Sequence, residues 1–212
     1  MTDYNNQTLI SFQHSFLERY KHDYIESTMY DSFFATPLLL FLYDVTTRRH
    51  NVLADALVNM QLSLNIHDQL DHHFDEDIEV EQLKSNQLHV LMGDYHSAFF
   101  YKLLSTHHET NMLHFFLPYI KEINEYKIEL LHHDHSIEQR LNKVSNVYSC
   151  LLQGVIQYFH LENEYSNIFI EQFVLQHAEA LPLYWMNSSS EDMRNAIQSR
   201  LNAIDSENNT YI

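Results

Sequence analysis

The chain of 212 residues carries 29 Asp and Glu against 12 Lys and Arg, which gives a formal net charge of −17. Such an acidic surface repels nucleic-acid phosphates and anionic lipid headgroups, so we expect neither as a partner. Only two glycines and three prolines interrupt the sequence, a composition that favours long helices over sheets with tight turns. The length suits one domain, and we therefore predict an all-α, single-domain helical bundle.

The N-terminal part predicts a helix followed by a short apolar segment. Apolar residues at helical spacing indicate a first amphipathic helix over residues 5–30, and Pro37 opens an apolar segment that ends near the turn at residues 46–49. The longest apolar run, residues 37–43, is too short to span a membrane. Because the N-terminus lacks a basic segment followed by an apolar core, we expect a cytoplasmic protein.

In the next predicted helix an apolar stripe leads to an acidic end. The stripe consists of Leu53, Leu57, Met60 and Leu64. It continues on the same helix face onto His67, Asp68 and Asp71. Residues 72–81 carry many carboxylates and little apolar content, so they indicate a solvated loop.

The rest of the chain is also expected to be helical. The expected helices cover residues 82–106, 110–132, 136–160, 163–184 and 190–205. Pro118 is expected to kink the second of these helices, and Pro182 is expected to end the fourth. The tail from Asp205 is expected to fray. Cys150, the one cysteine, lies on an apolar helical segment, so we interpret it as a core residue rather than a nucleophile.

The acidic helix end and a later Gly93-Asp94-Tyr95 sequence resemble the active-site helices of trans-prenyltransferases. Catalytic members of that group carry a DDxxD motif, which falls here on Asp68, Gln69 and His72, with Asp71 in the spacer. One carboxylate of the three survives, and the second aspartate-rich motif is missing. Together with residues 120–128, these features are similar to component 1 of heptaprenyl diphosphate synthase, a family of small non-catalytic subunits. The resemblance extends from about residue 53 to residue 130.

This resemblance implies a subunit that is inactive alone. Mg²⁺ prefers hard oxygen ligands, and Gln69 and His72 supply an amide and an imidazole instead, so we expect no catalytic residue and no metal in this chain. The resemblance places Mg²⁺ and both DDxxD motifs on a separate catalytic subunit, in a heterodimer that condenses farnesyl diphosphate with isopentenyl diphosphates for the menaquinone side chain. The present chain would stabilise that partner and help to set product length. The resemblance also suggests a degenerate synthase-like core at residues 48–132, flanked by N-terminal helices at 1–47, C-terminal helices at 133–205 and a tail at 206–212.

The helix around Gly93 is apolar on two sides, so it must be covered on two sides. A central core helix and a helix between subunits both satisfy this requirement, and the resemblance favours the second. The predicted subunit contact or channel wall comprises Gly93, Asp94, Tyr95, Phe99, Phe100 and Leu103.

Other functions remain open at this point. Asp68 and Asp71 can be a solvated helix end without function. An HD-type metal-dependent phosphohydrolase would use His50, the His67-Asp68 pair and Asp94 around a metal ion. A helical adaptor without any isoprenoid link is the third possibility.

Overall fold

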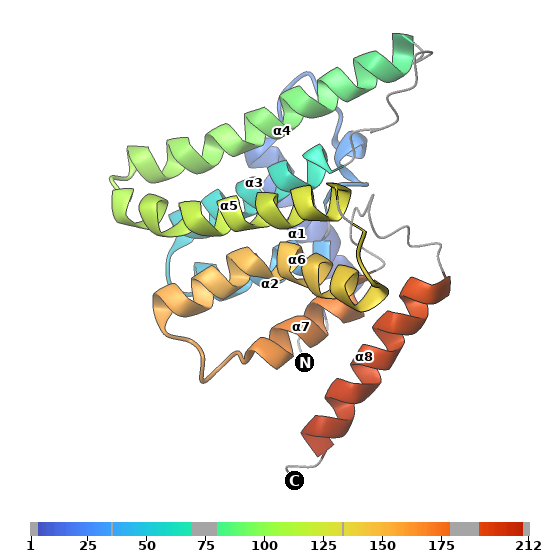
Figure 1. The fold of residues 1–212 in the computed structure, drawn as a ribbon. Helices are drawn as coiled ribbons and strands as arrows, with labels where there is room; N and C mark the ends of the chain where they lie inside the picture. The colour runs from blue at the N-terminus through green and yellow to red at the C-terminus, as the bar shows by residue number, and fades with distance from the viewer. Residues whose placement is uncertain (1–3, 35, 69–79, 133, 179–190, 210–212) are drawn as a thin grey trace. The chain divides into compact units, whose positions relative to one another are not determined.

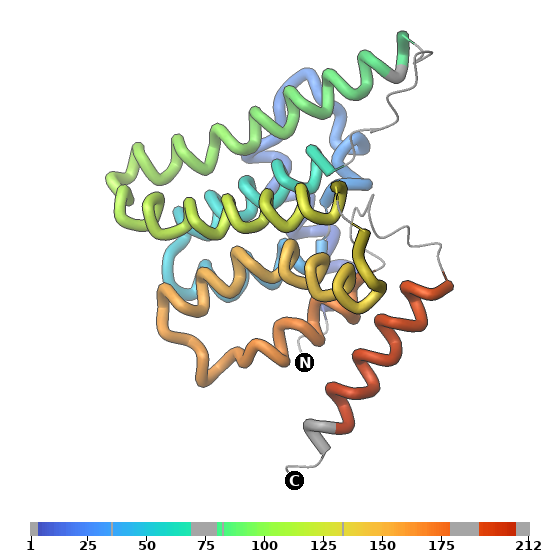
Figure 2. Tube along the Cα trace, viewed as in Figure 1, coloured from blue at the N-terminus to red at the C-terminus, as the bar shows by residue number. Residues whose placement is uncertain are grey.

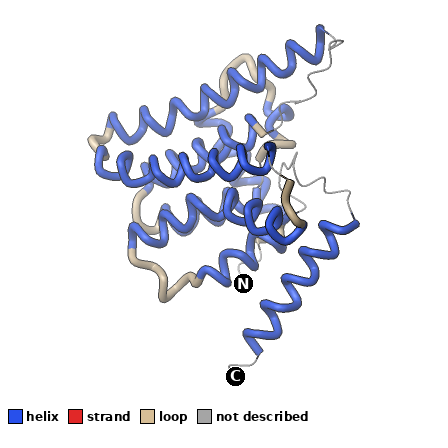
Figure 3. The backbone as a smooth tube through the Cα atoms, in the orientation of Figure 1, coloured by secondary structure: helices blue, strands red, loops and turns tan. Residues whose placement is uncertain are grey.

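The computed structural model describes residues 4–34, 36–68, 80–132, 134–178 and 191–209, and this part of the chain is helical with no strand (Figures 1 and 3). The elements are α1 (Asn6–Tyr20), the 3₁₀ helix η1 (Ser27–Tyr30), α2 (Thr36–Thr47), α3 (Asn51–His67), α4 (Val80–Thr106), α5 (Thr110–His132), α6 (Ile137–Phe159), α7 (Asn167–Gln176) and α8 (Glu191–Asn209). The all-α prediction is confirmed. Within the described ranges, no helix is long and apolar enough to cross a bilayer.

The chain forms two compact units. Of the described residues, those up to residue 110 belong to the first unit, with α1 to α4, and those from residue 111 onward belong to the second, with α5 to α8. We also expected a single domain and a reduced isoprenoid-synthase fold, and both stay predictions.

Helix α3 is the centre of the first unit, where it packs against α2 and along α4 (Figures 1 and 2). Its start is fixed by His50, whose Nδ1 accepts a hydrogen bond from the Leu53 N–H at 3.1 Å. Almost every residue from Leu53 to Ile66 is buried, including polar ones. Their polar groups are paired: the Asn65 amide, for example, donates to the Phe33 carbonyl at 3.0 Å. A helix buried on all sides in this way can hold its last turn in a fixed position.

Helices α5 and α6 of the second unit contact each other at Gly154. A capping box between Ser136 and Gln139 starts α6, and His160 ends it in the left-handed conformation. A Cβ at Gly154 would lie 2.9 Å from the Phe116 ring, so glycine allows α5 to approach at this point. Helices α7 and α8 pack on α6 and on each other.

Several predicted boundaries need correction. The first helix does not reach residue 30: it ends at Tyr20, where Lys21 turns to an extended conformation and donates its N–H to the Leu17 carbonyl. Helix α7 starts later than predicted because Ser166 caps it at residue 167, and it ends at Gln176, before Pro182, which lies outside the described residues. The tail does not fray from Asp205, since α8 continues to Asn209 and Asp205 accepts a hydrogen bond from Gln172 at 2.8 Å.

Candidate functional site

The end of α3 meets the middle of α4 at His67 and Gly93. A Cβ at residue 93 would lie 2.4 Å from His67 Nε2 and 2.6 Å from Cε1, so the imidazole ring occupies the space that any side chain at residue 93 would need. Non-bonded carbon and nitrogen atoms do not approach that closely. Glycine at this position is therefore what allows the histidine at the end of α3 to pack on the α4 backbone.

Asp94 lies beside the same edge of this ring. Its Oδ1 lies 3.5 Å from His67 Nε2, and its side chain is 67% exposed. The structure thus brings together three residues that the sequence singled out: His67, Gly93 and Asp94. They form a junction between the two helices, which we call the His67 junction.

Asp68 is in a different environment from the one predicted. It is the C-terminal cap of α3, its N–H donates to the Leu64 carbonyl at 3.2 Å, and it is only 3% exposed. The interpretation of Asp68 as a solvated helix end is therefore wrong, because the residue is enclosed together with the last turn of α3. Gln69, Asp71 and His72 lie outside the described residues.

A buried hydrogen-bond chain connects α4 to α3 and η1 one turn beyond the junction. The Tyr30 hydroxyl lies 3.1 Å from His96 Nε2, His96 Nδ1 lies 2.9 Å from Asn59 Oδ1, and the Asn59 amide donates to the Asp55 carbonyl at 2.9 Å. Since the Asn59 amide group is spent as a donor to Asp55, its oxygen accepts from a protonated Nδ1, and Nε2 accepts from Tyr30.

The side chains in this hydrogen-bond network are neutral at pH 7. Burial lowers the pKa of His96 to about 4 and raises the pKa of Tyr30 to about 12. Sequence reasoning missed His96. Its spacing of four residues from Met92 and from Phe100, both fully buried, placed it on the core face of α4.

The predicted contact residues of α4 do not share one side of the helix. Phe100 has no exposed surface in this chain, so it is a core residue, and the prediction that it anchors a partner does not fit its burial. Tyr95, Phe99 and Leu103 are half-buried. The Phe99 ring stacks edge-on against Tyr20 and Tyr95 at 5.2 and 5.1 Å, so it also contributes to packing within the first unit.

The side of α4 that faces away from the buried Phe100 carries exposed apolar residues. Leu91 is 65% exposed, and Leu83, Val90 and Tyr101 are also exposed. We define the outer face of α4 as Leu83, Val90, Leu91, Asp94, Ala98 and Tyr101, all of them exposed. On a helical wheel the other five residues lie within about 60° of Asp94, so this carboxylate is at the middle of the face.

The described donors of the His67 junction do not fit a Mg²⁺ site. Mg²⁺ takes oxygen ligands in octahedral geometry, and the junction offers one exposed carboxylate beside an imidazole. In the parts of the chain that the structure describes, no three His, Cys, Asp or Glu side chains come together in an arrangement suited to a metal ion. No catalytic step through a metal can be derived from these residues.

The phosphohydrolase alternative fails on geometry. His50 precedes α3 and contacts Glu109 at 3.1 Å, whereas His67 ends the same helix. Seventeen residues of helix separate the two histidines by about 25 Å, so they cannot bind one metal ion.

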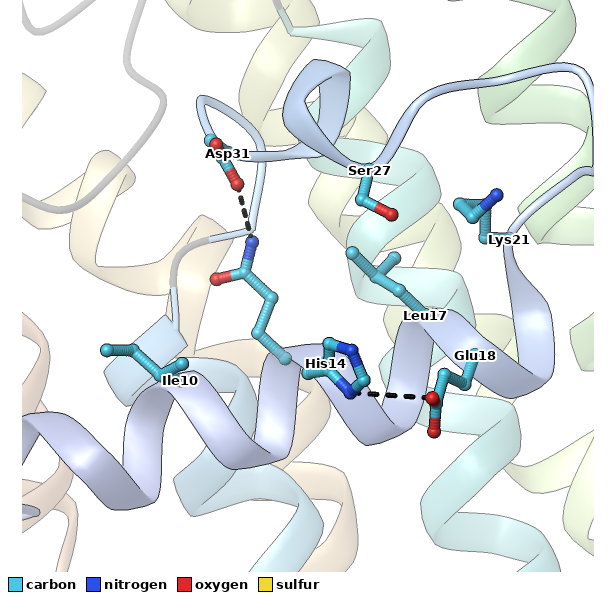
Figure 4. A pocket seen from close by; sticks show the side chains of 8 residues that line it. Ile10, His14, Leu17, Glu18, Lys21, Ser27 and Asp31 are labelled. Atoms are coloured by element: carbon cyan, nitrogen blue, oxygen red, sulfur yellow. Dashed lines mark hydrogen bonds and ion pairs between the residues drawn. The ribbon is translucent and has the colours of Figure 1, made fainter.

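Two pockets lie elsewhere. Figure 4 shows the first, about 280 Å³ between α1 and the η1 segment, with Leu17 among its lining residues and Glu18, Lys21 and Asp31 around it. The Gln13 amide donates to Asp31 at 2.9 Å across one end. The second, about 420 Å³, lies among α6, α7 and α8 and is lined by polar side chains, including the Arg200–Glu171 ion pair. Neither pocket includes a residue of the His67 junction or collects basic side chains that would hold a diphosphate.

Cys150 is buried, as predicted. Its Sγ lies 3.5 Å from the Tyr119 carbonyl and 3.8 Å from Glu122 Oε2. Burial, with the Glu122 carboxylate as the next cause, raises the pKa of the thiol to about 12. Such a thiol is protonated at pH 7 and is a poor nucleophile.

A family model described as heptaprenyl diphosphate synthase (HEPPP synthase) subunit 1 matches residues 14–210. The chain belongs to this family. A protein of Geobacillus stearothermophilus named heptaprenyl diphosphate synthase component 1 is 32% identical over 96 residues. That match covers 45% of the present chain and 38% of the relative's length. No solved structure matches the chain.

Proposed function

We propose that this chain is the non-catalytic, regulatory subunit of a heterodimeric long-chain polyprenyl diphosphate synthase, with a hepta- or octaprenyl product that serves as the menaquinone side chain. The observation that carries the proposal is the His67 junction. Asp68 at the end of α3 and Gly93-Asp94 on α4 resemble the helix pair of a prenyl synthase motif, and the sequence has Gln69 and His72 where that motif has carboxylates for Mg²⁺. Family membership supports the subunit role.

In this proposal the catalytic partner supplies both DDxxD motifs, Mg²⁺ and the sites for farnesyl and isopentenyl diphosphate. The heterodimer works in the cytoplasm. The present subunit stabilises the partner and forms part of the hydrophobic channel that sets product length.

The outer face of α4 is the proposed subunit contact. It presents Leu83, Leu91 and Tyr101 to solvent along one side of a 27-residue helix, and large apolar side chains that lie together on a surface are typical of protein interfaces. Phe100 is not part of this proposed contact, because its side chain is fully buried within the chain.

The activity test compares the chain alone with the reconstituted pair. The catalytic partner is obtained by co-purification from the native cell and is recognised by its two DDxxD motifs. With Mg²⁺, farnesyl diphosphate and radiolabelled isopentenyl diphosphate, the present chain alone should give no extension product, and the pair should give long-chain product. Extension by the chain alone, or no binding to a DDxxD protein, would contradict the proposal.

The interface test uses charge substitutions on the two sides of α4. Leu91→Asp should keep its helical circular dichroism and a cooperative melt but lose co-elution with the partner, because an unpaired charge buried in an apolar contact costs several kcal/mol. Phe100→Asp should fail to fold, since its ring is fully buried. Ile168→Asp, at an exposed apolar position of α7, is the matched control and should still pair. If folded Leu91→Asp and Tyr101→Asp both pair with wild-type affinity, the interface lies elsewhere.

A further inference from the structure

One charged residue, Asp94, lies in the middle of the outer face of α4, among exposed apolar side chains and next to the exposed, polar Gln87. Asp94 is flanked along the helix by Leu91 at i−3, Val90 at i−4, Ala98 at i+4 and Tyr101 at i+7, and all four are exposed. Residues three and four apart on a helix are neighbours on its surface. A partner that covers the apolar side chains must therefore also cover the Asp94 carboxylate.

The carboxylate is incompletely satisfied within this chain. Its one polar contact among the described residues is His67 Nε2 at 3.5 Å, beyond the usual range of a hydrogen bond, about 2.7–3.2 Å. In the free chain, water can reach the remaining lone pairs because the side chain is 67% exposed. Covering the outer face removes that water, and a buried carboxylate without a positive partner is strongly unfavourable.

The carboxylate is bounded on one side by the His67 ring. The His67 ring packs on Gly93, where no Cβ can intervene, and its Nε2 faces Asp94. The ring thus lies on one side of the carboxylate, and the other sides are open to solvent or to a partner.

We propose that the partner surface covering the outer face of α4 presents a cationic side chain to Asp94, and that this pair determines which protein the face accepts. An arginine fits best, because its planar guanidinium can bind both carboxylate oxygens and tolerates an apolar surround better than an ammonium group. The inference rests on the proposed function, since it names the chemistry of the same partner. It also explains why an acidic residue stands among the exposed apolar side chains of this face.

The test measures the affinity of the full chain for its catalytic partner by calorimetry, with Asp94→Leu as the informative variant. If a partner cation faces residue 94, the leucine leaves that cation buried and unpaired, and affinity should fall by about 30-fold or more. If no cation faces it, the leucine enlarges the apolar contact and affinity should rise. Asp134→Leu, at an exposed carboxylate in the loop before α6, is the control and should change affinity less than about twofold.

Two further measurements separate an ion pair from a structural effect. The affinity of the wild-type chain should fall as salt rises, and that of Asp94→Leu should depend on salt less. His67→Ala should weaken pairing less than Asp94→Leu does. Equal losses for the two variants with unchanged salt dependence would mean that residue 94 only holds α4 against α3, and the inference would be wrong.

Failure of the inference and failure of the proposed function give different results. If the wild-type chain does not bind a DDxxD protein, the proposed function fails. If it binds, and folded Asp94→Leu binds as well or better, the function stands and the cationic contact is refuted.

Discussion

Replacing Gly93 by alanine tests the packing of the His67 junction. The new Cβ would lie 2.4, 2.6 and 2.8 Å from three atoms of the His67 ring, so the ring must move, and its contact with Asp94 must change with it. Forcing an extra methyl group into a packed site costs about 1–3 kcal/mol. Alanine in place of glycine inside a helix returns about 1 kcal/mol. We therefore expect Gly93→Ala to lower the free energy of unfolding by about 1 kcal/mol.

The same substitution should have the opposite sign when the ring is absent. In a His67→Ala background there is no imidazole to displace, so only the helix-propensity gain remains and Gly93→Ala should stabilise by about 1 kcal/mol. The two positions should thus be coupled by about 2 kcal/mol. Other contacts that His67 makes are lost in both members of that comparison and cancel.

Urea unfolding of the four proteins, the wild type, each single variant and the double variant, measures this coupling. Circular dichroism and intrinsic tyrosine fluorescence should give coincident unfolding transitions with equal m values before the free energies are compared. A coupling below about 0.5 kcal/mol, with Gly93→Ala stabilising in both backgrounds, would show that the ring moves freely and that Gly93 is not required by His67.

Three further predictions concern buried groups. The pKa of His96 is about 4 in the folded chain against an ordinary 6.5, so the unfolded chain binds a proton first as pH falls. Between pH 6.5 and 4 the free energy of unfolding of the wild type should therefore drop by up to about 1.4 kcal/mol per pH unit more than that of His96→Gln, and parallel pH profiles for the two proteins would contradict this. Asp68→Ala should destabilise the chain by about 1–3 kcal/mol because Asp68 is buried. Asp68→Ala and Asp71→Ala should nevertheless each change the rate of the folded, reconstituted pair less than about tenfold, and a loss of several hundredfold would reveal a composite catalytic site. Iodoacetamide at pH 8 should leave Cys150 unmodified in the native chain and alkylate it after unfolding in urea, and rapid native labelling would show that the thiol is accessible.

The sequence by itself determined the elements that have a strong periodic pattern. Residues 110–132 were predicted as one helix, and α5 has these bounds, because buried apolar residues such as Met112, Phe116 and Ile123 recur at helical spacing over the whole segment. Local patterns suffice for such features because they depend on which residues share a helix face. The sequence also singled out His67, Gly93 and Asp94, but their contact was not predicted from it.

The tertiary structure alone decided which faces are covered. Periodicity placed Phe100 and Leu91 on α4 equally well as apolar residues, but only the packing of α3 against α4 makes the first a core residue and leaves the second exposed. Packing also buries Asp68 and joins His96 to Tyr30 across 66 residues. Burial and hydrogen bonding of this kind depend on neighbours distant in the sequence, and no window along the chain contains them.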